Sequence, residues 1–162
     1  MKSIINYIMF TIFVLTVQPI FVCATDDDGR WWDADFDGIS LSPIAGQGQT
    51  QEGSDTVILY ISGDSVISAD NTVNGPAELK NATDSLITKY KLEFDGDGSS
   101  NTGAANTAYA EYDSFLSTPI EIRHAIGDDD VQITLWVEAS NKPDNAADSG
   151  VYNATQTLTV SW

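Results

Sequence analysis

Alternation of apolar and polar residues with a period of two is the feature that most constrains this chain. One segment carries an apolar residue at every second position: Val131, Ile133, Leu135 and Val137. Successive side chains of a β-strand point to opposite faces, so this spacing predicts a strand with one buried face. Other segments rich in β-forming residues also predict strands: residues 56–61, 86–94, 109–116, 119–126 and 152–162.

Turns rich in Gly, Asp and Asn separate these segments, which favours antiparallel strands joined by short loops. Residues 76–85, with Pro76 at a plausible first helical position, are the part best suited to a short helix. The pattern therefore predicts an all-β fold of about seven or eight strands in a β-sandwich of two antiparallel sheets. A closed or jelly-roll-type β-barrel is the alternative, because patterning does not separate the two.

The first 24 residues have the pattern of a secretory signal peptide. Lys2 is basic, an apolar run extends from Ile8 to Val22, and Val22-Cys23-Ala24 offers a cleavage site after Ala24. Gln18 and Pro19 interrupt the apolar run, whereas a transmembrane helix needs roughly 20 apolar residues. We expect a secreted protein at the cell surface with no stable membrane insertion after cleavage. An uncleaved N-terminal anchor is the alternative.

Cleavage would leave an acidic N-terminal segment, residues 25–38, followed by a single β-sandwich domain, residues 39–162. The one cysteine, Cys23, would leave with the signal peptide. Burial and strand pairing alone must then hold the domain together, since no disulfide can form within it.

The chain has 24 acidic and seven basic side chains and a formal net charge of −17. Nucleic-acid phosphates require Lys and Arg, so the charge excludes a nucleic-acid partner and disfavours anionic lipid surfaces. We interpret the charge mainly as a source of solubility, with cation binding as the alternative.

The segment Asp148-Ser149-Gly150-Val151-Tyr152 has the D-x-G-x-Y form of a tyrosine corner. In this element the Tyr hydroxyl forms a hydrogen bond to the backbone a few residues upstream. Gly150 and Tyr152 therefore predict a fold element and not an activity.

The C-terminus continues from Gly150-Val151-Tyr152 into an alternating Thr/Val strand that ends in Trp162. From Ile87 onward the chain resembles spore-coat-U-type and related pilus-like secreted bacterial domains. That resemblance implies an immunoglobulin-like sandwich and a surface or pilus subunit, some of which are assembled by chaperone and usher. It also implies that five residues belong to a final strand at an assembly edge: Gly150, Tyr152, Leu158, Val160 and Trp162. Unlike many such domains, the mature chain has no cysteine.

Residues 33–38 match D-x-D-x-D-G, the opening of a calcium loop, with Asp33, Asp35 and Asp37 as candidate ligands. The second half of an EF-hand is missing, because Ile44 stands where a bidentate Glu belongs. Two interpretations remain, a looser Ca²⁺ loop and a solvated acidic segment.

Trp136 lies on the polar face of its strand, between Thr134 and Glu138. Exposed aromatic rings stack on sugars, so Trp136 is a candidate carbohydrate contact. The alternative is that Trp136 packs beneath a loop, since aromatic side chains dominate burial energetics.

No catalytic pattern is present: the chain has one histidine and no G-x-S-x-G nucleophile elbow. We therefore expect a secreted, non-catalytic structural protein, a cell-surface or pilus subunit that associates with itself or with other surface subunits. The alternative is a secreted carbohydrate-binding or adhesion module assisted by Ca²⁺.

Overall fold

A computed structural model describes residues 31–34, 36–71, 77–94, 107–124, 127 and 129–161. Within these residues the regular elements are all β-strands, as predicted. The strands are β1 (Trp31–Trp32), β2 (Thr50–Tyr60), β3 (Ser65–Asp70), β4 (Ile87–Phe94), β5 (Ala110–Glu111), β6 (Ile120–Ile122), β7 (Asp130–Ser140) and β8 (Thr157–Ser161). None of the described residues belongs to a helix long and apolar enough to cross a membrane. The expected signal peptide, residues 1–24, lies outside this part of the chain.

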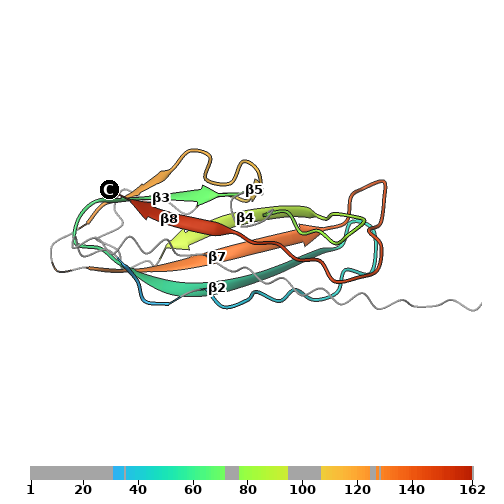
Figure 1. Cartoon of the computed structure of the whole chain (residues 1–162), viewed down its shortest axis with the longest axis horizontal. Helices are drawn as coiled ribbons and strands as arrows, with labels where there is room; N and C mark the ends of the chain where they lie inside the picture. Colours follow the sequence, from blue (N-terminus) through green and yellow to red (C-terminus); the bar gives the residue numbers. More distant parts are fainter. Residues whose placement is uncertain are drawn as a thin grey trace, which may run out of the picture.

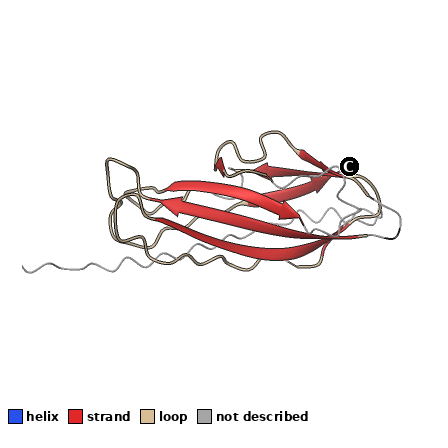
Figure 2. Cartoon of the chain, turned by 180° about the vertical axis from the view of Figure 1, so that it is seen from behind, coloured by secondary structure: helices blue, strands red, loops and turns tan. Residues whose placement is uncertain are grey.

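The strands form two antiparallel sheets that do not close into a barrel. The larger sheet has the order β1-β2-β7-β4-β5, and the smaller sheet has the order β6-β3-β8. Figure 1 shows the long strands β2, β7 and β4 in one layer and β3 with β8 in the other, all running along the long axis. Figure 2 shows the same arrangement from behind.

Strand β7 is the centre of the larger sheet, with β2 on one side and β4 on the other. Its alternate residues Val131, Ile133, Leu135 and Val137 are each 0% exposed. The predicted buried face of this strand is therefore confirmed.

Both sheets contribute to one hydrophobic core. Ile67, Ile122 and Leu158 enter it from the smaller sheet. Within it the ring centroids of Tyr90 and Phe115 lie 5.5 Å apart.

The extended segment after β1 also belongs to the core. Phe36, Ile39, Leu41 and Ile44 are all buried there, and Trp32 packs against the core. The structure thus places two residues of the expected acidic segment at the core: Phe36 within it and Trp32, in β1, packed against it.

The short helix expected near residues 76–85 is wrong for the described part of that segment, residues 77–85. Asn81 Oδ1 accepts the N–H groups of Thr83 and Asp84 at 2.8 and 2.7 Å. Lys80 pairs with Ser85 in a β-bridge around this turn. The Asn side chain thus takes backbone donors that a helix would use, which favours a turn.

Candidate functional site

Strand β8 is the end strand of the smaller sheet. It pairs with β3 from Asp70↔Thr157 to Val66↔Ser161, and no second described strand pairs with it. Leu158 is buried and Val160 packs against the core, which is the inner face that the sequence predicts. Thr159 is exposed on the opposite face. Trp162, expected to belong to this final strand, lies outside the described residues.

Four strands lie at sheet edges in the described part of the chain, namely β1, β5, β6 and β8. Strands β1 and β5 have only two residues each. Strand β5 contains Glu111, and β6 contains Glu121 after Pro119. Strand β8 has five residues, with no charged residue, proline or glycine. Short length, charge and proline protect sheet edges from pairing with other chains, and β8 has the least of this protection.

The lack of charge extends beyond β8 itself. Residues 149–162 contain no Asp, Glu, Lys, Arg or His, although the whole chain has a formal charge of −17. The C-terminal segment is therefore an uncharged strip on a strongly acidic protein.

Tyr152 anchors this segment where it leaves the loop before β8. Its side chain is 0% exposed, and its hydroxyl donates a hydrogen bond of 2.7 Å to the carbonyl oxygen of Asp148. This is the bond that a tyrosine corner requires. The pKa of Tyr152 is raised, mainly by burial and further by Asp84 and Asp148, while a side-chain hydrogen bond with Asn81 opposes the shift.

Gly150 lies close to the turn at residues 80–85. A Cβ atom at this position would lie 3.2 Å from Nδ2 of Asn81, tighter than most Cβ contacts. Glycine therefore lets the loop approach Asn81 closely enough for Tyr152 to occupy its buried position.

Backbone pairing ties the loop before β8 to the same turn. Lys80 and Asn153 exchange two backbone hydrogen bonds, at 3.0 and 2.9 Å. The carboxylate of Asp84 accepts the N–H groups of Ser85 at 2.8 Å and Asp148 at 3.1 Å. These two bonds lower the pKa of Asp84.

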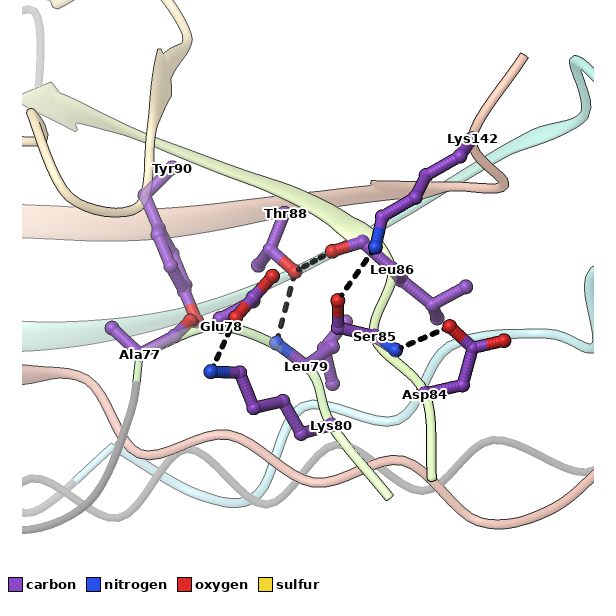
Figure 3. Close-up of polar contacts among 10 residues, drawn as sticks. All are labelled: Ala77, Glu78, Leu79, Lys80, Asp84, Ser85, Leu86, Thr88, Tyr90 and Lys142. Carbon is purple, nitrogen blue, oxygen red and sulfur yellow. Dashed lines mark hydrogen bonds and ion pairs between the residues drawn. The ribbon is translucent and has the colours of Figure 1, made fainter. Parts of the chain in front are cut away.

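Figure 3 shows side chains that hold this turn against β4. The Thr88 hydroxyl accepts the N–H of Leu79 at 2.9 Å and donates to the carbonyl of Leu86 at 3.1 Å. The Tyr90 hydroxyl donates to the carbonyl of Ala77 at 2.6 Å, and burial raises the pKa of Tyr90. Because these groups are buried and paired, the support for the C-terminal segment is rigid.

Trp136 lies on the outer face of the larger sheet in a polar cluster. Its Nε1 donates to Glu93 Oε2 at 2.7 Å, and Lys91 Nζ lies 2.7 Å from Glu93 Oε1. The same ammonium group lies 4.7 Å from the Trp136 ring centroid and 5.0 Å from the Tyr109 centroid. The indole is half-buried and already engaged at its nitrogen and over its ring.

Tyr109 has a buried hydroxyl oxygen for which the described residues offer no hydrogen-bond partner. Burial, together with Glu52, Glu138 and Glu93, raises the pKa of Tyr109 to about 12. The phenol therefore stays protonated at neutral pH and adds no charge to this face.

In the described part of the candidate calcium loop, Asp33 and Asp37 form hydrogen bonds with residues of β2. Asp33 donates its N–H to the carbonyl of Ile58, and its Oδ1 accepts the N–H of Ile58, both at 2.9 Å. The N–H of Asp37 donates to the carboxylate of Asp55. Asp35 is outside the described residues, and those residues contain no group of three His, Cys, Asp or Glu side chains arranged for a metal.

Some of these contacts are not predictable from local sequence. The Asn81 turn could have been found from its Asn-x-Thr-Asp run, since Asn and Asp bond nearby backbone groups. The contact of Lys91 with Trp136 depends on the register between β4 and β7, which local sequence does not reveal.

No protein-family model matches the chain, and no curated protein matches its sequence.

Proposed function

We propose that this protein is an exported, non-catalytic structural subunit of the cell surface, built as an immunoglobulin-like β-sandwich. It assembles with copies of itself or with other surface subunits into a filament or layer. The observation that carries the proposal is β8, an uncharged five-residue edge strand held by a rigid anchor.

An edge strand offers unpaired backbone groups to which another strand can add. The value of such an edge depends on how well it is ordered before binding, because ordering on contact reduces affinity. Here the Tyr152 hydroxyl bond and the Lys80–Asn153 backbone pair fix the chain just before β8. The edge is therefore preorganised for a partner.

The C-terminal resemblance to pilus-like domains supports the same role, and so does the acidic surface. A charge of −17 keeps an exported protein soluble and limits unspecific contact between copies.

Immunogold labelling with negative-stain electron microscopy of the producing cells tests the proposal. An antibody against this chain should mark ordered filaments or a regular layer on the cell surface. Label found only in the culture medium, with the protein in no assembly, would overturn it.

A secreted carbohydrate-binding or adhesion module is the second candidate, and Trp136 favours it. Its register partner on β2, Ser54, is small and exposed, so on this side the indole is flanked by a short polar side chain. Retention on insoluble chitin and cellulose tests this function. Trp136→Ala should abolish retention and Trp136→Phe should preserve part of it. Retention lost on adding EDTA would indicate Ca²⁺ assistance, and failure of the unaltered chain to bind either polymer would count against this candidate.

A further inference from the structure

The edge of β8 that pairs with no second described strand also points to a specific partner. We infer that β8 pairs with β8 of a second copy, antiparallel, about a twofold axis at Thr159. This inference rests on the proposed function, since it names the partner and the contact by which copies assemble. The joined sheet would have the order β6-β3-β8 followed by β8-β3-β6 of the second copy.

The sequence of β8 is complementary to itself in this register. Thr157-Leu158-Thr159-Val160-Ser161 alternates hydroxyl and apolar residues symmetrically around Thr159. Antiparallel pairing about Thr159 places Leu158 opposite Val160 of the second copy on the inner face. On the opposite face it places Thr159 opposite Thr159, and the buried Thr157 opposite the exposed Ser161, and such Thr/Ser pairs stabilise sheets.

Burial on the inner face favours the same arrangement. Leu158 is 3% exposed, but Val160 is only partly buried against the core. A second β8 would cover the open side of Val160 with Leu158 of the other copy. The contact therefore removes apolar surface from water, which is favourable.

Charge restricts where two copies can meet. Each chain has a formal charge of −17, so most approaches between copies are repulsive. Residues 149–162 contain no Asp, Glu, Lys, Arg or His, and Tyr152 is uncharged at neutral pH because its pKa is raised. Strand β8, Thr157–Ser161, is thus an edge strand that itself carries no charged residue.

Analytical ultracentrifugation of the purified chain at several protein concentrations tests the inference. The unaltered chain should form a dimer, and added salt should strengthen it by screening the net charge. Thr159→Glu and Thr159→Lys should each raise the dimer Kd by about tenfold or more, because like charges would meet at the twofold axis. An equimolar mixture of the two variants should restore a dimer, since Glu then faces Lys.

The same substitutions at Gln132 provide a matched control. Gln132 is exposed on the outer face of β7, away from any sheet edge. Gln132→Glu and Gln132→Lys should leave the dimer Kd within about threefold of the unaltered value, as expected for a charge outside the contact. Circular dichroism melting of every variant identifies any that fails to fold, and the unaltered chain and the control pair still decide the outcome.

A chain that stays monomeric at every concentration overturns the inference. So does a dimer that both Thr159 variants leave unchanged, or a mixture that does not restore it. The proposed function fails by a different result. Monomers in solution with labelled filaments on cells would refute β8 pairing alone, and dimers with no surface assembly would refute the structural role alone.

Discussion

Tyr152 and Asp148 lie four residues apart, and the hydroxyl of the first donates to the carbonyl oxygen of the second at 2.7 Å. The N–H of Asp148 in turn donates to the carboxylate of Asp84. One residue of the loop thus contacts both the buried tyrosine and the turn at residues 80–85. The start of the C-terminal segment is fixed from two sides before the chain enters β8.

Tyr152→Phe should lower the free energy of unfolding by about 1 kcal/mol, the usual net value of one hydrogen bond. Its ring would still fill the core, so the change removes only the hydrogen bonds of the hydroxyl, to the Asp148 carbonyl and with Asn81. Urea unfolding followed by fluorescence measures the difference, with an unchanged denaturant slope. Tyr112→Phe is the control, because no hydrogen bond of the Tyr112 hydroxyl is found among the described residues. Equal losses for both variants would contradict the role given to the Tyr152 hydroxyl.

Alternation predicted the strands whose buried faces are made of large apolar residues. Strand β7 is the clearest case, with Val131, Ile133, Leu135 and Val137 fully buried. Strand β3 was not predicted, since Ile67 is the only large apolar residue on its inner face beside Ser65 and Ala69.

The expected strand at residues 109–116 is mostly wrong. Only Ala110–Glu111 is a strand, and a turn follows that buries Phe115 and Leu116. Leu116 has a φ of +48°, a conformation that a leucine rarely adopts. Tertiary burial of these two side chains outweighs local preference here, so local sequence could not reveal the turn.

At the candidate site, too, local sequence predicts some features and long-range strand pairing determines others. The tyrosine corner is a local motif, and its bond to Asp148 could be predicted from the D-x-G-x-Y spacing alone. The edge position of β8 depends on the pairing of β3 with both β6 and β8, which are far apart in sequence. Local sequence predicts that β8 is a strand but does not place it at an edge.

Gly53→Ala should lower the free energy of unfolding by roughly 1–3 kcal/mol, the range for overpacking a core. A Cβ at this β2 position would lie 2.7 Å from Ile39 Cγ2 and 2.8 Å from Leu41 Cδ2. The Ile39 and Leu41 side chains would have to shift. Gly46→Ala is the matched control, because no atom lies within 4 Å of its added Cβ. Thermal and urea unfolding compare the two, and a Gly53→Ala variant as stable as Gly46→Ala would contradict the close packing.

Glu93 should make stability depend on pH. The hydrogen bond from Lys91, and then the one from Trp136, hold the pKa of Glu93 below its ordinary value. The charged form therefore stabilises the folded chain above about pH 4.3, the usual glutamate pKa, and this contribution disappears as pH falls through the lower folded pKa. The difference in free energy of unfolding between the unaltered chain and Glu93→Gln should therefore shrink as pH falls from the unfolded pKa through the folded pKa of Glu93. Lys91→Met, which removes the main cause, should abolish most of the dependence. A difference that stays constant with pH would refute the assignment.

Asp33→Ala should destabilise the fold by about 1 kcal/mol, since it removes the acceptor for the Ile58 N–H next to β1. Asp33→Asn keeps an oxygen at the Oδ1 position, so its loss of stability should be smaller. Both effects should be the same with EDTA and with added Ca²⁺, because the acceptor role needs no metal. Melting temperatures of the three chains under the two conditions provide the measurement. If Ca²⁺ raises the melting temperature of the unaltered chain and neither variant responds, the carboxylate serves a Ca²⁺ loop, as the D-x-D-x-D-G pattern predicts.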